Sequence, residues 1–212
     1  MSNLILLKDK ISAGKLEGAR AIVTEALEEG ISPEIIINDN MVKGMEDIGR
    51  KYEEGTAFVP NLLLAARAMR GCLEILTPHM KTNPISSLGT VIIGTVRGDL
   101  HDIGKNLVAS MLEGCGFKVI NLGVDVSAEQ FVDAVREHDA RIVCLSALLT
   151  TTMNYMKDIV TAFSAAGLRD KVKIMVGGAP LSQEFCDKIG ADGFSVNANG
   201  AVLLAKSLIC KS

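Results

Sequence analysis

The sequence contains no tryptophan, and aromatic residues make up only 4% of its 212 positions. Proteins that bind nucleic acid by stacking bases need aromatic side chains, so we expect no stacking platform here. Positive charge is scarce as well, because 22 Lys and Arg are outweighed by 25 Asp and Glu, which gives a net charge of −3. Nucleic-acid binders usually carry a basic face. The composition therefore argues against a nucleic-acid partner.

Long apolar runs are also missing. No stretch approaches the ~18 uninterrupted apolar residues of a membrane span, and the N-terminus lacks the basic and apolar regions of a signal peptide. The five cysteines are scattered and form no C-x-x-C pair. We interpret them as small buried hydrophobic residues in a reducing compartment. We therefore expect a cytoplasmic protein that has no membrane partner.

What the sequence does contain is apolar residues, at 48% of its length. In residues 1 to about 80 they recur with helical spacing, and turn signals divide this region into four segments. Those signals are Gly14, Gly30, Ser32-Pro33, Gly55, Pro60 and Thr77-Pro78. Helices joined by short connections predict an antiparallel four-helix bundle. The polar, proline-containing stretch Lys81–Leu88 then predicts a linker, with a helical domain at 1–86 and a second domain at 87–212.

The pattern changes after the linker to short apolar runs, each followed by a helical segment. The runs are Val91–Ile93, Val119–Ile120, Ile142–Leu145, Ile174–Val176 and Phe194–Val196. This alternation predicts buried parallel strands in a doubly wound α/β domain. Five strands suit the flavodoxin-like order 2-1-3-4-5. In that order the ligand crevice lies at the carboxyl ends of strands one and three. Ser127 to Gln130 is typical of a capping box at one helix start.

Three motifs fall at the ends of three predicted strands: Asp99–Gly104, Ser146–Leu148 and Gly177-Gly178. The first contains His101, and imidazole is a common metal ligand. A ligating histidine usually donates its second ring N–H to a carboxylate or carbonyl, which Asp99 can provide. The alternatives are a surface histidine and an Asp99 that caps the following helix. Asp102 is best interpreted as an acidic residue that favours the helix N-terminus.

Glycines and hydroxyls surround this histidine. Gly98 and Gly104 keep the first loop open, and Gly177-Gly178 would let a bulky ligand lie against the backbone, although ordinary strand-to-helix turns are the alternative. Ser146 and Thr150–Thr152 offer hydroxyls at the crevice, and Thr151 or Thr152 is also expected to cap the next helix. Neither G-x-G-x-x-G after the first strand nor G-x-x-x-x-G-K-[ST] is present, which disfavours nicotinamide, flavin and P-loop nucleotide sites.

Taken in order and spacing, the three motifs resemble the D-x-H-x-x-G, S-x-L and G-G signature of cobalamin-binding domains. Gly55–Pro60, continued by Ala65-Ala66 and Met69, resembles the helical cap of cobalamin-dependent methionine synthase and of small corrinoid proteins of methyltransferase systems. The resemblance covers essentially the whole chain. It departs from the family at Phe194–Ala198, where a tyrosine-and-aspartate version is commoner.

The resemblance implies a cobalamin or related corrinoid whose nucleotide tail is displaced. His101 would be the lower cobalt ligand, Asp99 would hydrogen-bond it, and Ser146 would lie behind that pair. The resemblance also implies cofactor contacts from both domains. In the second domain these are Asp102, Gly104, Leu148, Thr150, Gly177 and Gly178; in the cap they are Tyr52, Phe58, Val59 and Leu62. For each cap residue, a place in the bundle core is an equal alternative.

The function implied is a methyl shuttle rather than a complete enzyme. A substrate-specific methyltransferase would load the corrinoid, a second one would pass the methyl group to a thiol or folate, and a reductive activase would restore inactive cobalt. The donor stays open among methylamines, betaines, methanol and methoxylated aromatics. The alternatives are a cobalamin-sensing or light-sensing regulator, the cobalamin subunit of a carbon-skeleton mutase, and a flavodoxin-like interaction domain without cofactor.

Overall fold

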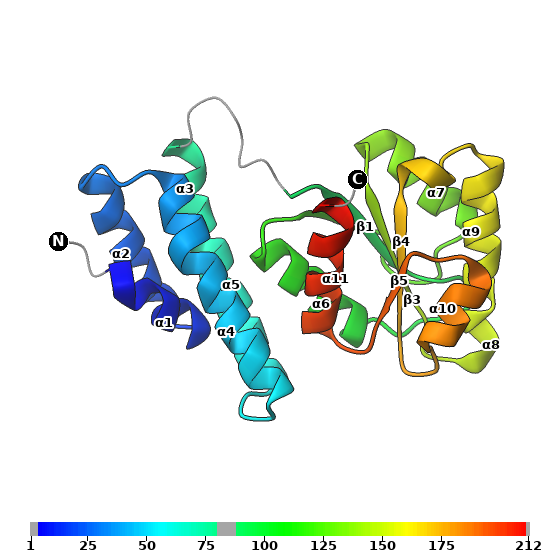
Figure 1. The fold of residues 1–212 in the computed structure, drawn as a ribbon, viewed down its shortest axis with the longest axis horizontal. Coiled ribbons are helices and arrows are strands. Elements are labelled where there is room, and N and C mark those ends of the chain that lie inside the picture. The colour runs from blue at the N-terminus through cyan, green and yellow to red at the C-terminus, as the bar shows by residue number, and fades with distance from the viewer. Residues whose placement is uncertain (1–3, 80–87, 211–212) are drawn as a thin grey trace. The chain divides into compact units, whose positions relative to one another are not determined.

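The computed structural model describes residues 4–79 and 88–210, which fall into two compact units (Figure 1). One unit is helical and the other is built around a sheet. Each has its own set of fully buried apolar side chains. The predicted linker Lys81–Leu88 lies, apart from Leu88, outside the described residues.

The helical unit follows the predicted segments closely. Its elements are η1 (Leu4–Leu6), α1 (Leu7–Ser12), α2 (Leu16–Glu28), α3 (Pro33–Ile36), the π-helical turn η2 (Ile37–Met41), α4 (Val42–Glu53), α5 (Val59–Leu76) and η3 (Thr77–His79). The stretch from α3 to α4 forms the third predicted segment. Helix α2 packs against α5, and α4 packs against both α1 and α5. The apolar faces therefore share one core, as the four-helix prediction requires.

A cluster around Asp47 joins α1 to α4. Ser12 Oγ donates to Asp47 Oδ2 at 2.6 Å, Lys51 Nζ lies 2.6 Å from the same oxygen, and Arg50 donates to Oδ1 at 2.7 Å. Burial alone would raise the pKa of Asp47, but these donors outweigh it and hold the pKa well below its usual range. The carboxylate therefore stays ionised where the two helices meet.

The second unit is a parallel five-stranded sheet in the order β2-β1-β3-β4-β5. Its elements are β1 (Thr90–Thr95), α6 (Ile103–Gly114), β2 (Lys118–Asn121), α7 (Ala128–His138), β3 (Ile142–Ser146), α8 (Thr150–Met153), α9 (Tyr155–Ala165), η4 (Arg169–Lys171), β4 (Lys173–Gly177), α10 (Gln183–Ile189), β5 (Gly193–Ser195) and α11 (Ala198–Cys210). Helices α6 and α11 cover one face of the sheet, and α7, α9 and α10 cover the other (Figure 1). The predicted α/β fold and strand order are confirmed.

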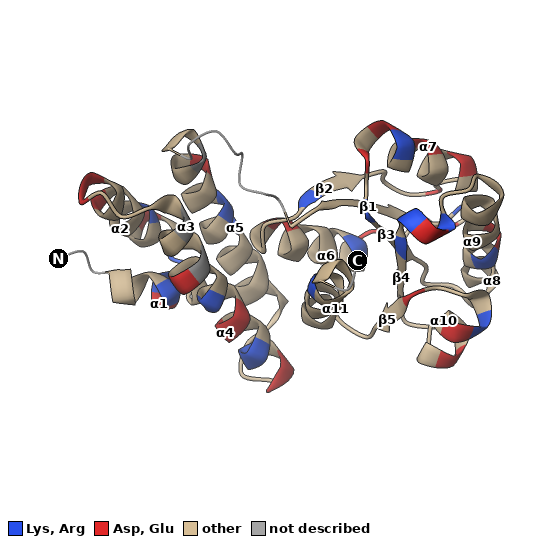
Figure 2. Ribbon diagram, turned by 45° about the horizontal axis from the view of Figure 1, so that its top comes forward, with Lys and Arg blue, Asp and Glu red and all other residues tan. Residues whose placement is uncertain are grey.

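Charge is kept out of this sheet. Within the strands, Lys118 and Lys173 are the only Lys, Arg, Asp or Glu residues, and each is the first residue of its strand. Other charges lie on helices and connections (Figure 2). The capping box at Ser127 is formed, because its hydroxyl accepts from the backbone N–H of Gln130, whose side chain accepts from the Ser127 N–H. None of the described helices is both long and apolar enough to span a membrane.

Candidate functional site

The register of the sheet brings three strand ends to one edge. Thr95 on β1 pairs with Ser146 on β3, and Ser146 pairs with Gly177 on β4. Because the strands are parallel, the loops that follow them leave the sheet at the same edge, which is where such folds bind ligands. The predicted motifs all lie on these loops or at these strand ends.

At the centre of this edge is the carboxylate of Asp99, which has no exposed surface. Its Oδ1 lies 2.7 Å from His101 Nδ1 and accepts the His101 backbone N–H at 3.1 Å. Its Oδ2 accepts from Leu148 N at 2.8 Å, Leu149 N at 3.3 Å and Thr152 Oγ1 at 2.7 Å. Both oxygens therefore have several donors, as a buried carboxylate needs.

These contacts fix the charge of Asp99 and the direction in which His101 meets it. Burial by itself would raise the pKa of Asp99, but the hydrogen bonds from Leu148, Thr152 and His101 outweigh it and hold the pKa well below its usual range. An ionised carboxylate can only accept hydrogen bonds, so a neutral His101 carries its proton on Nδ1. The lone pair is then on Nε2. Since 51% of the His101 side chain is exposed, about half of its surface is open to a ligand.

The hydroxyl that donates to Asp99 belongs to Thr152 rather than to Ser146. Ser146 instead uses its backbone carbonyl, which accepts from Val96 N at 3.0 Å. The expectation that Thr151 or Thr152 caps the next helix is wrong, because the N-cap of α8 is Leu149, without a side-chain cap. Asp99 instead holds the backbone just before α8, since it accepts the N–H groups of Leu148 and Leu149. One carboxylate thus orients His101 and fixes the connection that leads into α8.

The histidine loop itself is held by β1. Thr95 is fully buried, and its hydroxyl donates to the His101 carbonyl at 2.8 Å. On either side of the histidine, Leu100 is 72% exposed and Ile103 is 85% exposed. A side-chain methyl built at Gly104 would meet nothing within 4 Å. The imidazole therefore stands among apolar side chains and open space, which suits a large, flat, largely apolar ligand.

The glycine pair after β4 plays two different parts. Gly178 has φ 139° and a side chain there would collide with the carbonyl oxygen of Ala147, so this position requires glycine. Gly177 has room for a side chain at ordinary contact distance. Thr150 and Leu148 are exposed at the same sheet edge, after β3. The backbones of β3 and β4 thus approach closely where the second and third motifs meet.

The segment that departs from the family pattern keeps a helix cap. Asn197 Oδ1 accepts from Gly200 N at 2.8 Å at the start of α11, and Ser195 Oγ donates to the Asn197 carbonyl at 2.8 Å. Asparagine and aspartate cap helices about equally well. The amide therefore preserves this turn without a negative charge. Val196 beside it is 81% exposed.

The predicted cap residues differ in exposure. Phe58 is 68% exposed and Val59 is 36% exposed at the start of α5, whereas Tyr52 is half-buried. Leu62 is fully buried inside the helical unit, which is its alternative place in the bundle core. Phe58 and Val59 are therefore the cap residues that can offer apolar surface in this conformation.

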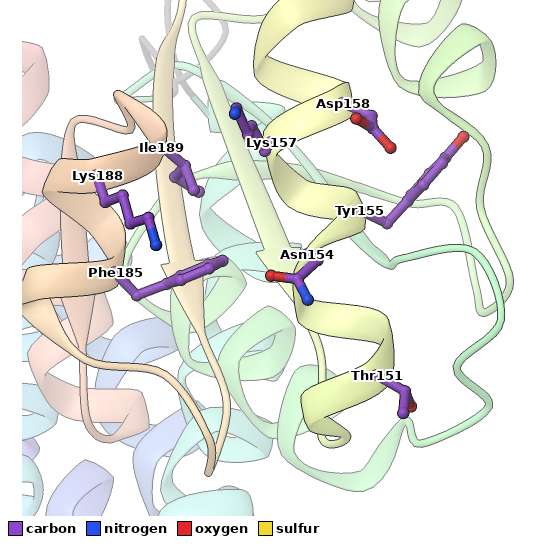
Figure 3. A pocket seen from close by; sticks show the side chains of 8 residues that line it. All are labelled: Thr151, Asn154, Tyr155, Lys157, Asp158, Phe185, Lys188 and Ile189. Atoms are coloured by element: carbon purple, nitrogen blue, oxygen red, sulfur yellow. The ribbon is translucent and has the colours of Figure 1, made fainter.

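A separate cavity of about 520 Å³ lies between α9 and α10 (Figure 3). Its lining includes Asn154, Lys157, Phe185 and Lys188. None of its lining residues belongs to the three motifs. The motif residues therefore define the candidate site independently of this cavity.

Comparison with known proteins agrees with this geometry. Models of a B12 binding domain match residues 89–203 and residues 6–77. Trimethylamine corrinoid protein 2 of Methanosarcina mazei is 44% identical over 204 residues, which cover 95% of this chain and 94% of that protein. A cobalamin-binding protein from Desulfitobacterium hafniense has a TM-score of 0.84 at 31% identity, covering 98% of this chain and 99% of that one. In the methanol:cobalamin methyltransferase complex MtaBC of Methanosarcina barkeri, one chain has a TM-score of 0.85 at 30% identity, covering 99% of this chain and 80% of that one.

Fold and site together define a doubly wound α/β domain that carries, at the switch point of its sheet, a half-exposed histidine oriented by a buried aspartate. The chain belongs to the B12-binding family, and the Desulfitobacterium protein whose structure it matches over 98% of its own length is itself a cobalamin-binding protein.

Proposed function

We propose that this chain is a corrinoid-carrying methyl shuttle. It accepts a methyl group from a substrate-specific methyltransferase and presents it to a second methyltransferase with a thiol or folate acceptor. The observation that carries the proposal is the 2.7 Å contact between Asp99 Oδ1 and His101 Nδ1, which presents Nε2 at the sheet edge. The corrinoid name of the Methanosarcina relative and the methyltransferase complex among the solved structures support it.

When bound, the corrinoid supplies the cobalt chemistry of methyl transfer. His101 offers one nitrogen ligand, and Asp99 holds its proton on Nδ1, which keeps Nε2 basic and correctly turned. Leu100 and Ile103 offer apolar surface to the macrocycle, and the missing side chain of Gly104 leaves room for it. The role of this chain is therefore to bind, orient and present, while its partners supply the substrates.

The displaced nucleotide tail is proposed to run between the first and third strands. Ser146, Leu148 and Thr150 would flank it from the β3 side, and Gly177 and Gly178 from the β4 side. The absence of a side chain at Gly177, where one would fit at ordinary contact distance, supports a pocket bounded by backbone at the end of β4.

The helical domain at 1–86 is proposed to cover the cofactor, with Phe58 and Val59 as its contacts and the 81–88 stretch as a hinge. A reductive activase and a location in the cytoplasm complete the proposal. The amine named for the Methanosarcina relative favours a methylamine donor over methanol, although the partner methyltransferase makes that choice.

The test is reconstitution of the purified protein with hydroxocobalamin, followed by reduction to cobalt(II) and electron paramagnetic resonance. Protein labelled with ¹⁵N-histidine distinguishes a histidine ligand from the benzimidazole of the cofactor, because only the former changes its nitrogen splitting from a triplet to a doublet. We expect this change in the wild type and in His138→Ala, and its loss in His101→Ala. A corrinoid that binds equally in all three proteins without any isotope effect would disprove the ligand role.

A further inference from the structure

Lys105, in the first turn of α6, is a charged side chain in a place where charge is costly. It is 4% exposed, and its ammonium donates to Asn106 Oδ1 and to Asn121 Oδ1, each at 2.7 Å. Burial lowers its pKa, and attraction to Asp102 partly opposes that shift. Both hydrogen-bond acceptors are neutral amides. Removing an ammonium from water is costly, and neutral acceptors offset that cost poorly, so this lysine is not expected to stabilise the fold. The arrangement therefore points to a role other than stability.

The ammonium dictates how both amides are turned. A lysine has donors only, so Asn106 and Asn121 must each direct their oxygen toward it. Their NH₂ groups are then aimed elsewhere: Asn106 Nδ2 donates to Asp102 Oδ2 at 3.0 Å, and Asn121 Nδ2 donates to Asn106 Oδ1 at 3.0 Å. Lys105 therefore sets the direction of a hydrogen-bond chain that ends on Asp102, the residue after His101.

A second branch reaches the other side of the histidine peptide. Asn121 Oδ1 also accepts from Gly123 N at 3.0 Å, and the Gly123 carbonyl accepts from Thr95 N at 3.0 Å. Thr95 in turn donates through its hydroxyl to the His101 carbonyl. The backbone that carries His101 is thus fastened from two directions. The first branch reaches Asp102 through Asn106, which accepts from both Lys105 and Asn121. The second branch passes through Asn121, whose oxygen Lys105 orients.

We propose that Lys105 is a positioning residue for His101, which fixes the start of α6 against the end of β2 and so sets where the imidazole Nε2 stands. This inference rests on the proposed role of His101 as a cobalt ligand. Lys105 acts on the backbone that carries His101, whereas Asp99 acts on the imidazole itself, whose orientation and tautomer it governs.

The test replaces Lys105 by the uncharged, similarly shaped methionine, with Lys118→Met as the matched control. Lys118 is exposed at the opposite end of β2. In cobalt(II) protein labelled with ¹⁵N-histidine, we expect the ratio of histidine-bound to histidine-free cobalt to fall about tenfold in Lys105→Met, the usual size for an outer partner of a metal ligand. The ratio should be unchanged in Lys118→Met, and both variants should retain corrinoid.

A purely structural lysine would lower thermal stability without changing that ratio, so an unchanged ratio in folded Lys105→Met overturns the proposal. Asn121→Ala is made in parallel, because its exposed side chain can be removed without opening a cavity. It should lower the ratio in the same direction, and an unchanged ratio there overturns the proposal even if Lys105→Met does not fold. Wild-type protein without any histidine coordination would instead refute the proposed function.

Discussion

At the scale of single residues, the site depends on one carboxylate with two tasks. Asp99 orients the imidazole of His101 with one oxygen and, with the other, holds the backbone that leads into α8. Because Thr152 also donates to the second oxygen, the carboxylate cannot turn without losing several hydrogen bonds at once. The direction in which His101 presents Nε2 is therefore built into the connection between β1 and β3.

Substitutions at two motif glycines distinguish effects on cofactor binding from effects on the stability of the fold. Gly104→Ala places a methyl group in open space at a helix start, so we expect the free energy of unfolding to stay level or rise by up to about 1 kcal/mol. Because that space is where we place the corrinoid, its binding should weaken about tenfold to a hundredfold. Urea unfolding and a hydroxocobalamin titration measure the two effects.

The matched variant is Gly178→Ala, which forces a side chain against the Ala147 carbonyl at a backbone φ of 139°. It should lower the free energy of unfolding by at least about 3 kcal/mol. If Gly104→Ala binds hydroxocobalamin as tightly as the wild type, the macrocycle does not lie over the start of α6.

The histidine and its carboxylate could be predicted from the sequence, because both belong to one short loop after an apolar run. The sequence predicts a cap from Thr151 or Thr152, since a threonine near a helix start usually acts locally. The hydroxyl of Thr152 instead donates to Asp99. Its contact with Asp99 spans 53 positions and depends on the register of β1 and β3. Nothing in the sequence marks Lys105 as buried, because a lysine in a first helical turn normally extends into solvent.

At the scale of elements, the positions of the strands and of the helical segments follow from the spacing of apolar residues and from the turn residues between them. The sequence predicts the third helical segment as one helix, and the structure adds the π-helical turn Ile37–Met41 within it. No glycine or proline within those residues indicates the turn in the sequence. The sequence predicts a helix after β3 with its cap at Thr151 or Thr152, but α8 already begins at Thr150. The backbone before it is held by Asp99 from another loop, which lies beyond local sequence patterns.

The junction of α1 and α4 gives a pH-dependent prediction. The folded pKa of Asp47 is below its unfolded value of about 3.9. Its stabilising effect is therefore fully present above that unfolded value and is lost as the pH falls through the folded pKa. Asp47→Asn should cost about 1–2 kcal/mol at pH 7, because the carboxylate is 11% exposed while its charged partners are largely in solvent.

Urea unfolding of Asp47→Asn and the wild type at pH 7 and at pH 3 measures this contribution, and the gap between the two proteins should narrow at the lower pH. Asp9→Asn, on α1 outside the cluster, serves as the control. A gap that is equal at both values would assign the loss to packing rather than to the charge of Asp47.

At the scale of the whole molecule, the helical unit and the sheet unit have separate cores, and only the sheet unit contains the histidine site. Proteins built in this way unfold in more than one step when their units have different stabilities. We expect two calorimetric transitions, with Asp47→Asn lowering the transition of the helical unit alone. The domain boundary proposed after residue 86 requires this separation.

Hydroxocobalamin then tests which unit contacts the cofactor. A ligand at 100 times its Kd stabilises the unit that binds it by about 2.7 kcal/mol. If only the sheet unit binds, only its transition should rise. If Phe58 and Val59 also cover the corrinoid, both transitions should rise and move together. Phe58→Ser, whose side chain is exposed, should then uncouple them without lowering the stability of the unliganded helical unit. If the unfolding temperature of the helical unit does not change when the wild type binds corrinoid, the proposed cap contacts are refuted, while the His101 site is unaffected.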